Sequence, residues 1–104
     1  MTYTLNIDKP ALALFKKLPR NAQRILIEKA QTLKTNPHAG DPLRGKYRLL
    51  RSLHLTINGT AYRIIYQVFQ TSETIVVRLA ATRENIYKKL DEMKLKPYTA
   101  GKPK

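Results

Sequence analysis

The first residues of the chain alternate between apolar and polar positions. Tyr3, Leu5 and Ile7 are each separated by one polar residue, which is the period of a half-buried strand. We therefore predict a strand over residues 3–7.

The next apolar residues recur at helical spacing in two successive stretches. Asp8 can cap a first helix that has Pro10 in its first turn, and Pro19 ends it. A second helix is predicted from residue 20 to about residue 35, where Asn36-Pro37 stops it. The pair forms a helical hairpin whose apolar stripes need a sheet to cover them: Ala11, Leu14, Phe15 and Leu18, then Ala22, Ile25, Leu26, Ala30 and Leu33.

The second half of the chain has the pattern of a β-meander. Residues 38–46 contain two glycines and a proline and are predicted to be a loop. Strands are predicted over 47–57, with apolar residues at Leu49, Leu53, Leu55 and Ile57, and over 62–69 and 74–79. Asn58-Gly59 is a strong signal for a tight hairpin turn between the first two. Helical spacing returns over 83–93 through Ile86, Leu90 and Met93.

The element order is therefore β-α-α-β-β-β-α. It predicts an α+β fold, with an antiparallel-rich sheet, an N-terminal helical hairpin on one face and a short C-terminal helix. Residues 1–95 are expected to form a single domain, and residues 96–104 a basic, flexible tail.

The amino-acid composition limits the kinds of function that the protein can have. The chain has 104 residues and no cysteine, and 20 Lys+Arg against 7 Asp+Glu give a formal net charge of +13. A disulfide framework, a cysteine-ligated metal and a thiol nucleophile are excluded. The sequence shows no secretory signal and no apolar run long enough to span a membrane. So high a charge predicts binding to a large anion: nucleic acid, an anionic membrane or an acidic protein. We expect a cytoplasmic protein with no membrane partner.

The positive charge is concentrated. No acidic residue lies between Pro42 and Ser72, and the basic residues there are Arg44, Lys46, Arg48, Arg51 and Arg63. His54 and Thr56 alternate with apolar neighbours, so they should share the face of the sheet opposite the core. We predict that one face is apolar and packed on the helices and that the other is basic and open. The alternative is a solvated polar face with scattered arginines.

Known catalytic motifs are absent from the sequence. It has neither a phosphate-binding GxxxxGK[ST] loop nor a GxGxxG dinucleotide fingerprint, and seven acidic residues in all make a two-metal nuclease improbable. Any phosphodiester chemistry would have to use Arg, Lys, His and Tyr without a metal, and we expect no cofactor.

Several segments together resemble the RelE/ParE toxins of bacterial toxin–antitoxin pairs. They are the first strand, the helical hairpin that ends in TLKTNP, the PLRG loop, the strand AYRIIYQV and an R-x-x-x-Y start of the last helix. The similarity covers about residues 3–90. The PLRG and AYRIIYQV segments are its most specific part, and they are closer to the RelE branch.

The resemblance implies a toxin that enters the ribosome and cuts messenger RNA. The implied reaction is metal-free: the substrate's own 2′-OH attacks the adjacent phosphate and leaves a 2′,3′-cyclic phosphate and a 5′-OH. It also implies a cognate antitoxin. We expect that partner to carry an acidic, amphipathic segment that covers part of the basic face or displaces the last helix, with the toxin monomeric within the complex.

The resemblance also assigns roles to residues. Arg63 matches the arginine that holds the phosphate, Arg83 the one that stabilises the transition state or donates a proton, and Tyr87 the tyrosine that orients or activates the 2′-OH. Tyr87 lies four positions after Arg83, which would place them on one helical face. Tyr87 could instead simply pack on the sheet.

The sequence departs from the RelE pattern on the strand before the turn. Two lysines of that pattern align with His54 and Thr56. An imidazole titrates close to neutral pH, so His54 suits a general base; the alternative is a surface histidine. A register slip of one residue would change this face, and Arg48 and Arg51 would then be the nearest replacements. With Arg44 and Lys46, these two are expected to bind RNA.

Two other functions stay open. One is a ParE-like toxin of the same fold, without nuclease activity, that inhibits DNA gyrase. The other is a plain basic nucleic-acid-binding module, for which the sequence has no aromatic platform motif.

Overall fold

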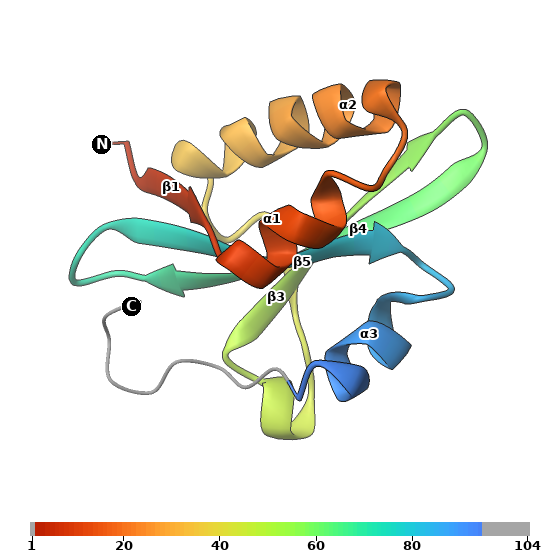
Figure 1. Cartoon of the computed structure of the whole chain (residues 1–104). Coiled ribbons are helices and arrows are strands. Elements are labelled where there is room, and N and C mark those ends of the chain that lie inside the picture. Colours follow the sequence, from red (N-terminus) through yellow and green to blue (C-terminus); the bar gives the residue numbers. More distant parts are fainter. Residues whose placement is uncertain (1, 95–104) are drawn as a thin grey trace.

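The computed structural model describes residues 2–94 and gives the predicted order of elements with one addition (Figure 1). The predicted tail, 96–104, lies outside the described residues. The helices are α1 (Lys9–Phe15), α2 (Arg20–Gln31) and α3 (Ile86–Glu92), and the strands are β1 (Thr4–Ile7), β2 (Asp41–Pro42), β3 (Leu50–Ile57), β4 (Thr60–Phe69) and β5 (Thr74–Thr82). Short 3₁₀ turns cover Thr32–Lys34 and Gly45–Tyr47. The α+β prediction is confirmed.

The five strands form one mixed sheet in the order β1-β5-β4-β3-β2. β1 runs parallel to β5, and the other neighbours are antiparallel. The additional strand, β2, was predicted to be part of a loop. It has two residues, one of them proline, and lies at the sheet edge, where a missing N–H is tolerated.

The helical hairpin covers one face of the sheet, as predicted. Leu26 and Ala30 of α2 and Phe15 of α1 are buried against Ile64 and Val77 of the central strands. This cluster is the main hydrophobic core. The apolar residues predicted to line one side of the second helix do face this core, and the last of them, Leu33, is fully buried.

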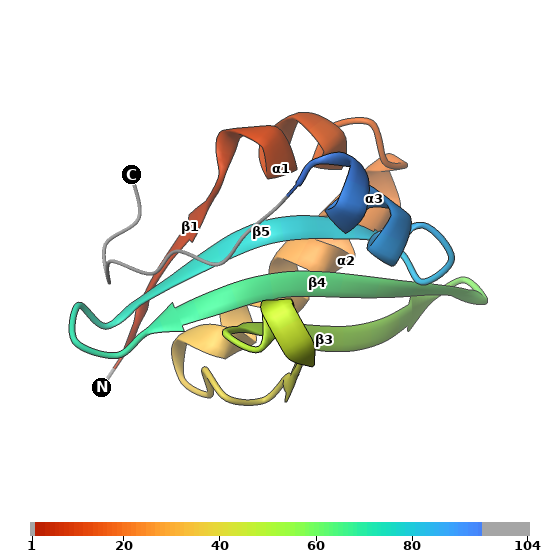
Figure 2. The same ribbon diagram turned by 90° about the horizontal axis from the view of Figure 1, so that it is seen from below.

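The opposite face is not open along its whole length, which corrects the prediction. A second core cluster lies there, where Leu50, Ile65 and Leu79 of the strands pack against Ile86 and Leu90 of α3. Figure 2 shows α3, in blue, beside the strands that it covers. The basic part of this face is therefore limited to the region next to α3.

The last helix is shorter than predicted. The backbone N–H of Arg83 donates to the carbonyl oxygen of Ala61 at 2.8 Å, which continues the pairing of β5 with β4. Residues 83–85 then form a turn, and α3 begins at Ile86.

A buried ion pair holds the junction between β1 and α1. Asp8 precedes α1, but its side chain makes no capping hydrogen bond, contrary to the prediction. Its carboxylate instead accepts a hydrogen bond from the guanidinium of Arg78, which also donates to Gln67. Arg78 lies at the irregularity between β4 and β5 and is buried. A charge in this position needs such partners.

Within residues 2–94, no helix is long and apolar enough to cross a membrane.

Candidate functional site

The turn between β3 and β4 sets the geometry of the site. Asn58 and Gly59 have φ values of 49° and 80°, so both occupy the left-handed region that a two-residue hairpin turn requires. The resulting register places His54 directly opposite Arg63. Such opposed residues have Cβ atoms about 4.5–5.5 Å apart and project from the same face.

Arg63 is held by α3. Its Nη1 donates a hydrogen bond of 2.8 Å to the hydroxyl of Tyr87, and its Cζ lies 5.6 Å from the centre of the Tyr87 ring. Arg63 is half-buried and His54 is exposed, whereas Tyr87 is 48% exposed. The guanidinium is thus fixed by one hydrogen bond, and its other donors are left for an anion.

Arg83 lies on the same side of the sheet. Arg63 pairs with Ala81 of β5, and Arg83 comes two residues later, so its side chain leaves the same face. Arg83, Arg63 and His54 line one shallow depression. The expectation that Arg83 and Tyr87 share a helical face is wrong, because Arg83 precedes α3; the sheet brings Arg83 to the site, and the helix brings Tyr87.

Of the four residues expected to bind RNA, Arg44, Lys46 and Arg48 lie near the site and Arg51 does not. Arg44 lines a second depression with His54, Arg63 and Tyr87. Lys46 and Arg48 are exposed around the following 3₁₀ turn, and Nζ of Lys46 lies 5.1 Å from the centre of the adjacent Tyr47 ring.

Arg51 does not join them. It pairs with Tyr66 on the face that carries the main core. Its guanidinium donates to the carbonyl oxygens of Gly40 at 2.9 Å and His38 at 3.3 Å. The structure therefore gives Arg51 the role of fixing the loop before β2.

Sequence reasoning missed two residues beside the site, Ser52 and Asp41. They pair with each other across β3 and β2, and both line the depression that contains Arg44. The position of Ser52 was available from the sequence, since it is two residues before His54 on the same strand. That of Asp41 was not, because it depends on β2.

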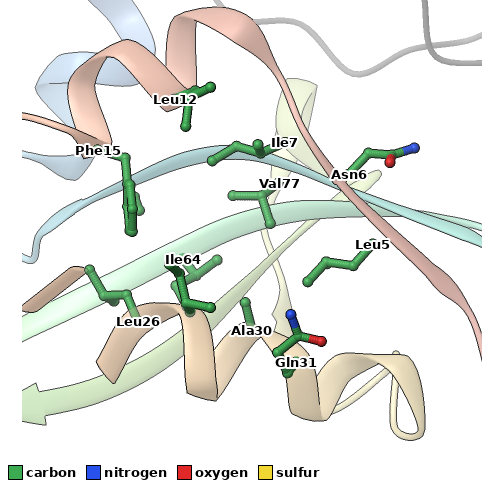
Figure 3. A pocket seen from close by; sticks show the side chains of 12 residues that line it. Leu5, Asn6, Ile7, Leu12, Phe15, Leu26, Ala30, Gln31, Ile64 and Val77 are labelled. Atoms are coloured by element: carbon green, nitrogen blue, oxygen red, sulfur yellow. The ribbon is translucent and has the colours of Figure 1, made fainter. Parts of the chain in front are cut away.

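A further hollow of the surface is apolar and lies between β1, α1 and α2 (Figure 3). Leu12 and Phe15 of α1 and Leu26 of α2 face into it, with Leu5 and Ile7 of β1 at its side. Ile27, at its border, is 49% exposed. An apolar groove of this kind on a highly charged molecule is typical of a protein-binding surface.

Comparison with known proteins identifies the family. The model of the ParE-like toxin of type II bacterial toxin–antitoxin systems matches residues 5–91. The chain belongs to this family. No curated protein matches the chain significantly.

Several solved structures of RelE toxins are similar to this toxin. A mutant of E. coli toxin RelE in the free state is 25% identical, with a TM-score of 0.71 over 91% of this chain and 100% of that chain. The toxin–antitoxin complex RelBE2 from Mycobacterium tuberculosis gives 27% identity and a TM-score of 0.68, over 80% and 93% of the two chains. The intact E. coli RelBE complex gives 27% identity and a TM-score of 0.64, over 76% of this chain and 94% of that chain. The resemblance to the RelE branch is confirmed.

Proposed function

We propose that this toxin cuts messenger RNA on the ribosome and so inhibits translation in the cytoplasm. One observation supports this most strongly: Arg63 is directly opposite His54, hydrogen-bonded to Tyr87 and in one depression with Arg83. A base, phosphate-binding cations and a hydroxyl thus come together on an exposed strand pair.

The proposed reaction is a transfer within the RNA. The 2′ oxygen bonds to the adjacent phosphorus, and the bond from phosphorus to the 5′ oxygen breaks, which leaves a 2′,3′-cyclic phosphate and a 5′-OH. His54 takes the proton from the 2′-OH, which Tyr87 orients. Arg63 grips the phosphoryl oxygens, for which a planar guanidinium is well suited.

Arg83 completes the group from the end of β5. It stabilises the charge that develops on the phosphate, or it supplies the proton that the departing 5′ oxygen needs. Within residues 2–94, no three His, Asp or Glu side chains gather as metal ligands. The proposal assigns all of the chemistry to the side chains themselves.

We propose further that a cognate antitoxin with an acidic, amphipathic segment binds one copy of the toxin. The RelBE2 structure from Mycobacterium tuberculosis and the intact E. coli RelBE structure are both toxin–antitoxin complexes. The apolar groove between α1 and α2 fits the apolar face of such a segment. The net charge of +13 favours an acidic polar face.

Gyrase inhibition is the alternative. It is favoured by the absence of lysines at positions 54 and 56, where the RelE pattern has them. The same fold would then act by protein binding alone, and His54 would be an ordinary surface residue.

Two assays on the purified toxin separate these functions. Primer extension on a translated message should show cuts only when ribosomes are present. A supercoiling assay with DNA gyrase should show no inhibition. Inhibited gyrase together with an intact message would contradict the proposal and support the alternative.

A further inference from the structure

The depression beside the proposed catalytic group has a second wall that phosphate chemistry does not explain. His54, Arg63 and Tyr87 line it, and so do Ser52 and residues 41–44, which are called its second wall here. We propose that this depression is a subsite for one nucleobase next to the cleaved phosphate, and that Asp41 makes it select a base with an exocyclic amino group. This inference rests on the proposed nuclease function.

Ser52 is the first observation that points to a ligand. The residue is only 2% exposed, and its Oγ is the one buried side-chain polar atom within residues 2–94 that lacks a hydrogen-bond partner. Buried hydroxyls are normally paired, and leaving one unpaired costs stability. Since Ser52 lines the depression, a bound group can supply the missing partner.

The charges on the second wall are the next observation. Asp41 and Arg44 are both exposed and enclose Pro42 and Leu43, so an acceptor and a donor border an apolar patch. Neither forms an ion pair with another residue in the described part of the chain. A second phosphate would be repelled by the carboxylate of Asp41. A nucleobase has an apolar ring with polar edges and fits both features.

The chemistry of Asp41 decides which bases fit. An ionised carboxylate only accepts hydrogen bonds, so it favours the amino groups of cytosine, adenine and guanine. Uracil has no amino group; the one donor on its pairing edge, N3–H, lies between two carbonyl oxygens that the carboxylate repels, so its hydrogen bond to Asp41 is weaker. Ser52 can donate to a ring carbonyl or accept from an amino group, so it strengthens binding without setting this preference.

The position of the depression links it to the cleavage site. It shares His54, Arg63 and Tyr87 with the catalytic group, and Arg63 also borders the depression that contains Arg83. A nucleotide with its phosphate on Arg63 can therefore place its base against Ser52 and Asp41.

The test measures binding and does not depend on cleavage. The four nucleoside 3′-monophosphates are titrated into the purified toxin by calorimetry, with inorganic phosphate as the reference. CMP, AMP and GMP should each bind about 5-fold more tightly than UMP, the effect of one net hydrogen bond. Asp41→Asn should remove the preference, because an amide both donates and accepts.

Glu92→Gln is the matched control, since it makes the same change of charge at an exposed position at the end of α3, outside the depression. It should leave the preference unchanged. Ser52→Ala should weaken the binding of all four nucleotides about 5-fold without lowering the melting temperature, because the hydroxyl that it removes has no partner. A merely structural serine would give the reverse: a lower melting temperature with unchanged binding.

Equal affinities for the four nucleotides would overturn the subsite, as would binding no tighter than that of inorganic phosphate. The subsite would also be overturned if Asp41→Asn, like Glu92→Gln, left the preference for CMP, AMP and GMP over UMP unchanged. If the preference is found while ribosome-bound message stays intact, the nuclease function fails and the subsite stands. If the message is cut and no preference is found, only the subsite fails.

Discussion

Arg63 derives its position from two contacts that have different origins. The pairing with His54 follows from the β3–β4 register, and the hydrogen bond to Tyr87 follows from the docking of α3. Neither contact uses all the donors of the guanidinium. In the proposed reaction, the side chain would thus be oriented in advance for a phosphoryl group, which is how preorganised donors lower a barrier.

Tyr87→Phe tests the second contact. The substitution removes the hydroxyl and keeps the ring against the guanidinium, so single-turnover cleavage of ribosome-bound message should fall about 100-fold, with little change in melting temperature. Tyr47→Phe is the control, because it removes a hydroxyl that binds Asp91 of α3 at 3.0 Å, away from the cleavage site. Equal rates for the two variants would exclude Tyr87 from the reaction.

Tyr66 is a second residue with a measurable individual effect. Its hydroxyl donates to the carbonyl oxygen of Pro37 at 2.9 Å and accepts from the N–H of Gly40 at 2.8 Å. Tyr66→Phe leaves both groups unpartnered and should lower the free energy of unfolding by about 1–3 kcal/mol, measured by urea denaturation at pH 8.

The same residue predicts a dependence on alkaline pH. Burial raises the pKa of Tyr66, although Gly40 and Arg51 oppose the shift. The folded protein therefore favours the neutral phenol. The resulting stability is fully present below the unfolded value of about 10 and is lost as the pH rises through the folded pKa. Above pH 10 the wild type should lose stability faster than Tyr66→Phe; parallel curves would contradict this.

At the scale of elements, α3 holds part of the site through its packing. Ile86 and Leu90 are fully buried against Leu50, Ile65 and Leu79, and this packing holds the neighbouring Tyr87 where its hydroxyl reaches Arg63. Leu90→Ala should therefore cost about 2–5 kcal/mol. Leu49→Ala, at a side chain that is 48% exposed, should change the free energy of unfolding by less than about 0.5 kcal/mol. Chemical denaturation measures both, and a small effect of Leu90→Ala would mean that α3 is loosely attached.

The sequence predicted the elements whose signals are local. The period-two pattern and the Asn58-Gly59 turn were sufficient to pair β3 with β4, and counting outward from the turn places His54 opposite Arg63. Leu49 shows where this reasoning failed. It was assigned to the strand, but β3 begins at Leu50 after a 3₁₀ turn, so Leu50 is buried and Leu49 is exposed.

The remaining features depend on contacts between elements that are distant in the sequence. The second core cluster exists because α3 folds back on the sheet, and this also creates the contact between Tyr87 and Arg63. Arg51 was predicted to lie on the basic face together with the other basic residues of the same segment. Its position on the strand places it with Tyr66 on the other face.

At the scale of the whole molecule, the toxin presents two different surfaces. The basic one surrounds Arg63, and the apolar groove lies between β1, α1 and α2. We propose that an RNA substrate binds the first surface and that the apolar face of a protein helix or strand binds the second. An antitoxin can therefore bind tightly through the groove while its acidic residues face the positive charge of the toxin.

Ile27→Glu tests the groove as an antitoxin-binding surface. Ile27 borders the groove and is 49% exposed, and Leu49, outside the groove, is 48% exposed. Leu49→Glu is therefore a control matched in exposure to Ile27→Glu, and neither substitution should change the free energy of unfolding much. Ile27→Glu should weaken binding of the cognate antitoxin about 10-fold or more in calorimetry, because it puts an unpaired carboxylate into an apolar interface, and Leu49→Glu should not. Equal affinities would place the antitoxin elsewhere.

The central claim is that Arg63 acts on a phosphate in a cleavage reaction. The most direct measurement is the single-turnover rate of cutting of a ribosome-bound message by wild type, Arg63→Ala and Arg44→Ala. Arg63→Ala should reduce the rate about 10²–10³-fold with an unchanged circular dichroism spectrum, whereas Arg44→Ala should weaken binding and leave the rate at saturation nearly unchanged. Small and equal effects of the two substitutions on that rate would contradict the account.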